Sequence, residues 1–229
     1  MPDLFKGILF DFDGTLAKTM EGHFNAWQAV MRKYAVDLKP EDYYPLEGAP
    51  LQELVHLFSL MKPGAISLSD QLIRQIVQQK ENYYTRHSRF TLYPGVEFLV
   101  DSLKKKRIRM GIVTAGLNDR IKKSTPQEFL EKFDVLVTGD MTVRGKPYPD
   151  PYLKGAEALD LRPDECIVVE NAPLGVQSAK AANFYCIGVC STLDRSYFTE
   201  ADEMVDCFED LKDSRAIHRV MRAGILQGR

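Results

Sequence analysis

Cysteine and tryptophan are scarce in this chain, which has four cysteines and one tryptophan among its 229 residues. The cysteines form neither a CxxC pair nor the regular ladder of a disulfide-stapled domain. Three of them lie inside apolar stretches, so we expect small core residues that stay reduced in the cytoplasm. The four are Cys166, Cys186, Cys190 and Cys207. The spacing therefore argues against a disulfide scaffold.

Long hydrophobic runs and a dominant charge are absent as well. No apolar stretch approaches the roughly 18 residues that a membrane-spanning helix needs, and Pro2 and Asp3 interrupt any signal-like start. Lysine and arginine number 30 against 32 aspartates and glutamates, a formal charge of -2 that gives no electrostatic reason to bind nucleic acid. We expect a cytoplasmic protein with neither membrane nor nucleic-acid partners.

Short runs rich in Ile, Val, Leu and Phe alternate with amphipathic patterns of helical period along most of the chain. This alternation predicts an α/β fold with a parallel sheet whose strands are buried on both faces. The expected strands are 8–12, 108–114, 135–138, 167–169 and 187–189, and the expected helices between them are 96–106, 126–132, 151–159 and 174–182.

The region between the first two expected strands has only helical periodicity. We therefore predict a discontinuous α/β core, residues 1–16 and 92–229, that carries an inserted helical cap at 17–91. Pro63-Gly64 separates two cap helices, and Pro94-Gly95 marks the return to the core. The last segment, with Ile217, Val220, Met221, Ile225 and Leu226, predicts a docking helix. The alternative is a dimer contact, so we expect a monomer or a weak homodimer.

Two carboxylates close the first expected strand, in the run Phe10-Asp11-Phe12-Asp13-Gly14. At positions i and i+2 they project to the same side, roughly 6 to 7 Å apart. Two like charges there need a cation, and Gly14 allows the backbone to turn closely around an anion at the carboxyl end of the sheet. With Mg²⁺ bound, Asp11 could attack a phosphate and Asp13 could serve as acid and base. An acidic turn after a strand is the alternative.

Three further strand ends carry complementary chemistry. Thr114 offers a hydroxyl next to the main-chain N–H groups of Ala115 and Gly116, where phosphate oxygens could be held. Lys146 lies in the proline-restricted run Gly145-Lys146-Pro147, and its fixed ammonium could screen a transferring phosphoryl group. Glu170-Asn171 supplies oxygen ligands of the kind that Mg²⁺ prefers. Each has a structural explanation by itself, such as capping or a loop ion pair.

Taken in order, these four motifs resemble those of the haloacid dehalogenase-like superfamily, in its β-phosphoglucomutase-like and phosphoglycolate phosphatase-like branch. The resemblance covers nearly the whole chain and implies a Rossmann-like core, an all-helical cap and a small phosphorylated metabolite as substrate. It implies a catalytic set of Asp11, Asp13, Thr114 and Lys146, and a Mg²⁺ site of Asp11, Asp13 (through its main-chain carbonyl), Glu170 and Asn171. The substrate-binding residues that it implies are Gly14, Thr15, His23, Lys80, Ala115, Gly116 and Asn118.

Two departures from the family pattern bear on function. Asn171 stands where many relatives have Asp, so we expect weaker Mg²⁺ binding, with Glu170 taking over part of the role. The loop at 48–53 lacks the arginine with which the mutases hold a second phosphate. The sequence therefore predicts a Mg²⁺-dependent phosphatase that hydrolyses a small phosphomonoester, such as a sugar phosphate, through an aspartyl phosphate on Asp11. The alternatives are a hexose-phosphate mutase and a weakly active binding protein.

Overall fold

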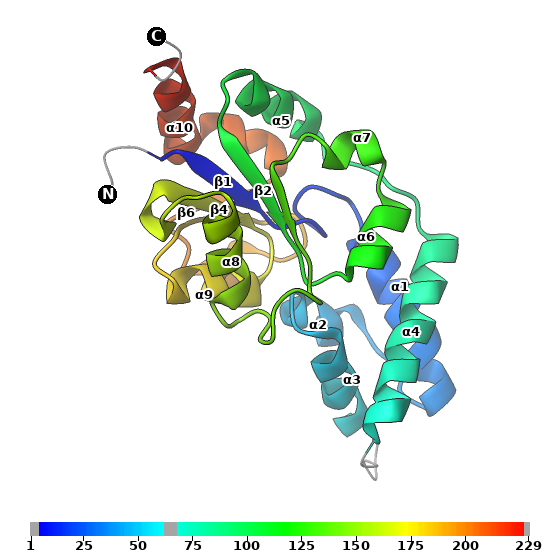
Figure 1. The fold of residues 1–229 in the computed structure, drawn as a ribbon. Coiled ribbons are helices and arrows are strands. Elements are labelled where there is room, and N and C mark those ends of the chain that lie inside the picture. Colours follow the sequence, from blue (N-terminus) through cyan, green and yellow to red (C-terminus); the bar gives the residue numbers. More distant parts are fainter. Residues whose placement is uncertain (1–4, 62–67, 227–229) are drawn as a thin grey trace.

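A six-stranded parallel sheet forms the centre of the molecule, with strand order β3-β2-β1-β4-β5-β6 (Figure 1). The computed structural model describes residues 5–61 and 68–226, and side chains as far as residue 222. The strands are β1 (Gly7–Phe10), β2 (Arg109–Val113), β3 (Val135–Val137), β4 (Cys166–Glu170), β5 (Tyr185–Val189) and β6 (Glu203–Val205). The structure confirms the predicted α/β, Rossmann-like fold. Since the chain leaves β1 toward β2 on one side and returns to β4 on the other, β1 ends at a switch point where such sheets bind ligands.

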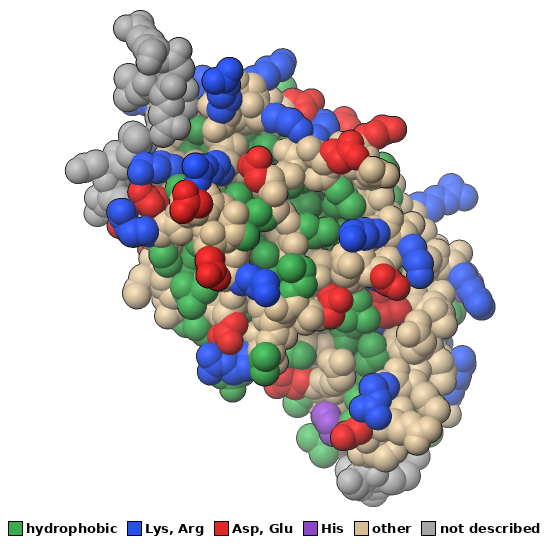
Figure 2. Space-filling model, in the orientation of Figure 1, with side chains coloured by type: hydrophobic (Ala, Val, Ile, Leu, Met, Phe, Trp, Pro, Cys, Tyr) green, Lys and Arg blue, Asp and Glu red, His purple; other side chains and the backbone are tan. Residues whose placement is uncertain are grey.

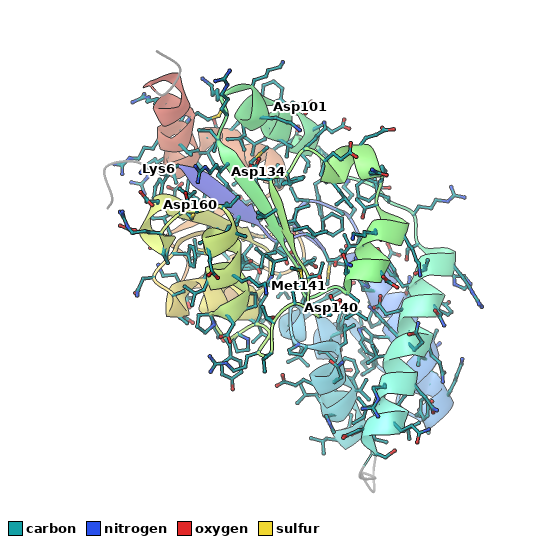
Figure 3. The ribbon with its side chains drawn as sticks, viewed as in Figure 1. Lys6, Asp101, Asp134, Asp140, Met141 and Asp160 are labelled. Atoms are coloured by element: carbon teal, nitrogen blue, oxygen red, sulfur yellow. The ribbon has the colours of Figure 1, made fainter. Side chains whose placement is uncertain are left out.

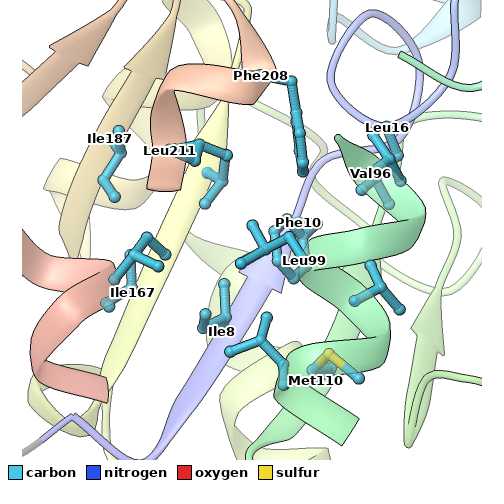
Figure 4. Close-up of a cluster of buried hydrophobic side chains, with 14 of the residues drawn as sticks. Ile8, Phe10, Leu16, Val96, Leu99, Met110, Ile167, Ile187, Phe208 and Leu211 are labelled. Carbon is cyan, nitrogen blue, oxygen red and sulfur yellow. The ribbon is translucent and has the colours of Figure 1, made fainter. Parts of the chain in front are cut away.

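Both faces of the sheet are covered, because successive side chains of a strand point to opposite sides. Ile8 and Phe10 pack on one face against helices and the segment near Phe208, as Figure 4 shows, while Leu9 packs on the other. The first face is covered by α5 (Val96–Lys105) and α10 (Arg215–Leu226), and the second by α8 (Asp150–Ala158) and α9 (Pro173–Ala181). The short helices α6 (Asn118–Ser124) and α7 (Gln127–Leu130) follow β2.

A separate bundle of helices, here called the cap, lies beyond the carboxyl ends of the strands (Figure 1). It consists of α1 (Met20–Met31), α2 (Pro40–Tyr43), α3 (Leu51–Leu60) and α4 (Asp70–His87). Its own hydrophobic cluster is centred on Trp27, whose ring meets that of Phe58 edge-on at 5.4 Å between centroids. Short 3-10 helices complete the fold at Arg32–Tyr34, Tyr44–Leu46, Pro163–Glu165, Arg195–Phe198 and Phe208–Asp213.

The two chain crossings between core and cap lie side by side. Ala17 and Leu92 form an antiparallel bridge. The N–H of Lys18 donates to the carbonyl of Thr91 at 2.8 Å, and the N–H of Tyr93 donates to the carbonyl of Leu16 at 3.0 Å. The cap is therefore joined to the core by a short two-stranded ribbon.

Several details differ from the sequence expectations. Strand β1 ends at Phe10, so Asp11 and Asp13 lie in the loop beyond it, and the short elements β6 and α6 have no expected counterpart. Cys207 is exposed and thus is no core residue, because it lies in the polar segment before Phe208. Pro63-Gly64 falls outside the described residues, as do the side chains of Ile225 and Leu226, while Ile217 and Val220 are buried in α10.

The surface of the molecule carries charges of both signs (Figure 2). Positive and negative side chains are interspersed on the face shown in Figure 2. Within residues 5–61 and 68–226, no helix combines the length and apolar character that crossing a bilayer requires.

Candidate active site

Asp11 lies directly after β1 and is held by a lysine from a distant loop. Its Oδ1 accepts a hydrogen bond from Lys146 Nζ at 2.7 Å, and the same ammonium donates to Glu170 Oε1 at 2.6 Å. Burial by itself lowers the pKa of Lys146, but the two carboxylates outweigh it and raise that pKa. One ammonium cannot neutralise both acids. Burial raises the pKa of Asp11 to about 7. Lys146 offsets this rise only in part, and the charge on Glu170 adds to it.

The second carboxylate oxygen of Asp11 bears on whether a metal fits. Asp11 is only 6% exposed, and its Oδ2 is buried without a hydrogen-bond partner among the described residues. A buried, unpaired carboxylate oxygen is costly unless a cation or donor meets it. The described residues contain no group of three His, Cys, Asp or Glu side chains arranged as a metal site. The oxygen ligands available next to Asp11 are hard and suit Mg²⁺, but they do not form a complete cluster of acids.

Asp13 is the most heavily bonded acid of the site. Arg120 Nη1 donates to its Oδ1 at 3.0 Å, and Nη2 donates to its Oδ2. His23 Nε2 lies 3.0 Å from Oδ1, and the hydroxyl of Thr114 lies 3.4 Å from Oδ2. Burial alone would raise the pKa of Asp13, yet Arg120 and His23 hold it well below its usual range. Asp13 is thus ionised in this arrangement.

A chain of buried polar groups leads from Asp13 into the cap. Lys80 Nζ lies 2.9 Å from His23 Nδ1 and donates to Glu81 Oε1 at 2.8 Å. Because the ammonium can only donate, His23 accepts at Nδ1 and carries its proton on Nε2, facing Asp13. Burial and the nearby Lys80 lower the pKa of His23 to about 4. The ring is therefore neutral, and it bridges the Lys80 ammonium and the Asp13 carboxylate by hydrogen bonds.

Asn171 lies after β4 and links the core to the cap. Its Oδ1 accepts from the hydroxyl of Thr15 at 2.8 Å. Its Nδ2 donates to Glu47 Oε2 at 2.8 Å and to Thr192 Oγ1 at 3.2 Å. Gly14 has φ +85°, and a Cβ there would lie 2.2 Å from Asn171 Nδ2, so this close approach requires glycine.

Two adjoining cavities open at this end of the sheet, and Gly48, Leu51, Thr114 and Ala115 line both. The inner one, of about 40 Å³, lies between Asp11 and Asp13 of the core and Glu47 and Lys80 of the cap. The outer one, of about 320 Å³, reaches from Pro50 to Lys146. An inner polar chamber with a roomier mouth suits a small ligand with one strongly charged end.

The structure brings most of the expected site residues together. Seven line the inner cavity: Asp11, Asp13, His23, Lys80, Thr114, Ala115 and Gly116. Gly14, Thr15, Glu170 and Asn171 are not among the lining residues of either cavity; Asn171 contacts Thr15. Asn118 lines neither cavity, and its N–H donates to Asp140, which lies where core and cap meet (Figure 3).

Three charged residues of the site have no place in the sequence prediction: Glu47, Glu81 and Arg120. The loop at 48–53 does lack an arginine, but the inner cavity contains the guanidinium of Arg120, which comes from α6. Helix α6 has few apolar positions and no motif around Arg120. The one signal that could have revealed it is position, since α6 follows β2 and Thr114 directly.

Comparison with known proteins identifies the family. The family model described as haloacid dehalogenase-like hydrolase matches residues 8–189. Validoxylamine A 7'-phosphate phosphatase of Streptomyces hygroscopicus subsp. limoneus is 29% identical over 218 residues, which cover 94% of this chain and 98% of that protein. Hexitol phosphatase A of Escherichia coli (strain K12) is 32% identical over 207 residues, which cover 90% and 93% respectively.

Solved structures agree with this result. A putative β-phosphoglucomutase from Bacteroides vulgatus has a TM-score of 0.83 and 27% identity, and the match covers 97% of this chain and 90% of that one. The family match spans most of the chain, and the aligned phosphatases cover nearly all of it. The chain belongs to the haloacid dehalogenase-like hydrolase family and is a phosphoric monoester hydrolase.

Proposed function

We propose that this phosphatase hydrolyses a small phosphomonoester, with sugar and sugar-alcohol phosphates as the first substrates to test, through a covalent phosphate on Asp11. The observation that carries the proposal is the unpaired, buried Oδ2 of Asp11, in an acid that lines a polar cavity and is held from behind by Lys146. The outer cavity is large enough for a small polyol. A hexitol phosphatase among the relatives supports this substrate class.

The reaction proceeds in two steps on this chain's own residues. An oxygen of Asp11 attacks phosphorus, the bond from phosphorus to the ester oxygen breaks, and the departing oxygen takes a proton from Asp13. Water then attacks the phosphorus of the aspartyl phosphate and gives its proton to Asp13. The bond to Asp11 breaks, which releases inorganic phosphate. The Lys146 ammonium stabilises charge on Asp11 and on the transferring group throughout.

The protonation of Asp13 must change during this cycle. In the structure Arg120 keeps Asp13 ionised, which suits the second step, in which it accepts a proton. An incoming phosphate dianion raises the pKa of a neighbouring carboxyl group and competes for the guanidinium. We propose that the substrate phosphate draws Arg120 partly away from Asp13, so that Asp13 can carry the proton that the first step needs.

The hard oxygen donors around the unpaired Oδ2 of Asp11 suit Mg²⁺. The residues that would hold it are Asp11, Asp13 through its main-chain carbonyl, Asn171 and Glu170. When bound, it supplies neutralisation of the charge on the nucleophile and the phosphate. We expect hydrolysis to require it, and Lys146 alone cannot replace it because that ammonium is shared with Glu170.

Water is the phosphoryl acceptor in this proposal. A mutase must hold a second phosphate, for which a free bidentate arginine is suited. The arginine of the inner cavity is Arg120, whose terminal nitrogens bond Asp13 and which we assign to the reacting phosphate during the cycle. No guanidinium among the described lining residues is therefore free for a second phosphate.

The test is release of inorganic phosphate from a panel of hexose, pentose and hexitol phosphates by the purified protein, with and without Mg²⁺. We expect release with Mg²⁺ and none from Asp11→Asn, while Asp194→Asn, an exposed turn acid, behaves as wild type. Mass spectrometry of the denatured protein should show phosphate on Asp11. Interconversion of sugar phosphate isomers without free phosphate would instead establish the mutase, and phosphate release by Asp11→Asn would refute the nucleophile.

A further inference from the structure

Glu47 is a buried acid of the cap that faces the acids of the core. It is 6% exposed, lies between the 3-10 helix Tyr44–Leu46 and α3, and lines the inner cavity together with Asp11. Its side chain accepts a hydrogen bond from the Asn171 amide, 2.8 Å away. Across residues 5–61 and 68–226 no lysine, arginine or histidine forms an ion pair with Glu47. A buried carboxylate without a cation is costly, so its position calls for one.

The surrounding charges also leave room for a divalent cation. The buried acids around the cavities outnumber the buried bases by two: they are Asp11, Asp13, Glu47, Glu81 and Glu170 against Lys80, Arg120 and Lys146. The bases are already committed, since Arg120 bonds Asp13, Lys80 bonds Glu81, and Lys146 bonds Asp11 and Glu170.

Opposite Glu47, at the end of β4, lies the neutral amide of Asn171. Its oxygen accepts from Thr15 and its nitrogen donates to Glu47, so the amide brings no negative charge to the site. Gly48, with φ +84°, turns the loop directly after Glu47, and a Cβ there would lie 3.2 Å from Lys146 Cδ. The loop thus passes closely over the catalytic lysine, with Glu47 lying over the end of β4.

We infer that Glu47 is a ligand of the divalent cation, contributed by the cap, and that it supplies the carboxylate that the core lacks at Asn171. The inference rests on the proposed Mg²⁺ dependence and goes beyond it, because it makes metal affinity depend on cap closure. The coupling is reciprocal: cap closure increases the affinity for the cation, and a bound cation shifts the equilibrium toward the closed cap by the same free energy.

The test is direct titration of Mn²⁺ into the full-length protein without substrate, with free Mn²⁺ followed by its electron paramagnetic resonance signal. Removing a side chain that only orients a metal ligand weakens affinity by about 10- to 100-fold, and removing a ligand should weaken it by at least as much. We expect this loss for Glu47→Gln and tighter binding than wild type for Asn171→Asp. The double variant Glu47→Gln with Asn171→Asp should bind Mn²⁺ with close to wild-type affinity. It keeps an amide-to-carboxylate hydrogen bond between the two positions, and its carboxylate now belongs to the core.

The control is Glu53→Gln, an exposed acid of α3, which should bind Mn²⁺ as wild type does. Circular dichroism verifies that each variant is folded. Wild-type affinity in folded Glu47→Gln would overturn the inference, even where Asp11→Asn abolishes binding and so supports the metal site itself. Failure of the proposed metal site is different, since the wild-type protein would then bind no Mn²⁺ and Asp11→Asn would change nothing.

Discussion

Arg120 is the residue on which the charges of the inner cavity converge. Its guanidinium bonds both oxygens of Asp13, and its Nε lies 3.7 Å from Glu81 Oε2. All three side chains are buried. Buried acids of this kind are tolerated only while their counter-charge is present. Arg120 therefore stabilises the contact between the cap and the core as well as setting the charge of Asp13.

Arg120→Met should destabilise the protein strongly because it leaves Asp13 and Glu81 without this guanidinium. We expect the free energy of unfolding at pH 7, measured in urea, to fall by about 3 to 5 kcal/mol. Arg86→Met, at an exposed position of α4, should change it by no more than about 0.5 kcal/mol. A loss below about 1 kcal/mol for Arg120→Met would show that the buried acids find other partners.

His23 makes the stability of the metal-free protein depend on pH. Lys80, Asp13 and Arg120 face its ring, and Tyr84 stacks on it at 3.9 Å. Burial lowers its pKa from 6.5 to about 4. Between these values the unfolded chain binds a proton that the folded chain refuses, so stability is full above pH 6.5 and is lost as pH falls toward 4.

Replacing His23 should remove this part of the acid sensitivity. We expect His23 to account for about 2 kcal/mol of the stability lost between pH 7 and pH 5. Urea unfolding of His23→Gln at the two pH values should show a fall smaller by that amount, whereas His56→Gln, at an exposed site on α3, should match wild type. An equal fall in wild type and His23→Gln would contradict the assignment.

The sequence was most informative where chemistry is tied to a strand end. Asp11, Thr114 and Glu170 follow or end buried strands, and parallel strands bring their carboxyl ends to one edge, so their proximity could be predicted. Glu47 and Arg120 could not be found this way. They belong to a short loop and a short polar helix, and their proximity to the site depends on how the cap closes on the core.

The helices of the cap form a hydrophobic unit of their own. Trp27 and Phe58 are fully buried in it, and Tyr43 packs on Phe58 at 6.5 Å between ring centroids. Helices α1 and α4 pack together, and Lys80 of α4 lies 5.3 Å from the Trp27 ring. Packing inside the cap therefore also positions a polar residue of the cavity.

Phe58→Ala should disturb both the cap and the site. A buried phenylalanine truncated to alanine costs about 3 to 5 kcal/mol. We expect that loss in urea unfolding followed by fluorescence of Trp27, together with a shifted native emission because the ring that faces Trp27 is removed. Phe98→Ala, whose ring is 76% exposed on α5, should stay within about 0.5 kcal/mol of wild type. Similar losses for both variants would contradict a tightly packed cap.

Elements with a long apolar pattern were predictable, and short polar ones were not. The runs around Ile8 and Ile167 correspond to β1 and β4, because a strand buried on both faces must be continuously apolar. Strand β6 has three residues and includes Glu203, and α6 has Ile121 as its main apolar position. These two elements form because neighbouring strands and helices provide partners, which no local pattern of the sequence reveals.

At the scale of the whole molecule, the site lies between two units that each have a hydrophobic core. Asp11 and Asn171 belong to the core, while Glu47 and Lys80 belong to the cap. A ligand bound among them contacts both units at once. Binding there should therefore stabilise the entire fold rather than one part of it.

Removal of the metal should accordingly lower the melting temperature of the intact protein. At about a hundred times its dissociation constant, Mg²⁺ adds about 2.7 kcal/mol of stability, which for a chain of this size corresponds to a rise of about 5 to 10 °C. Differential scanning calorimetry with Mg²⁺ and with a chelator measures it, and sodium chloride of equal ionic strength is the control. An equal rise with sodium chloride would attribute the effect to screening.

The ribbon that joins cap and core has a consequence for protein engineering. Because Ala17 and Leu92 face each other across an antiparallel bridge, everything between them is topologically one long hairpin loop. A two-residue turn could close the same ribbon, and insertions are best tolerated where the two chain ends lie together. The pair Ala17 and Leu92 thus marks a splice point at which this cap could be exchanged for that of a relative, to transplant substrate preference onto an unchanged catalytic core.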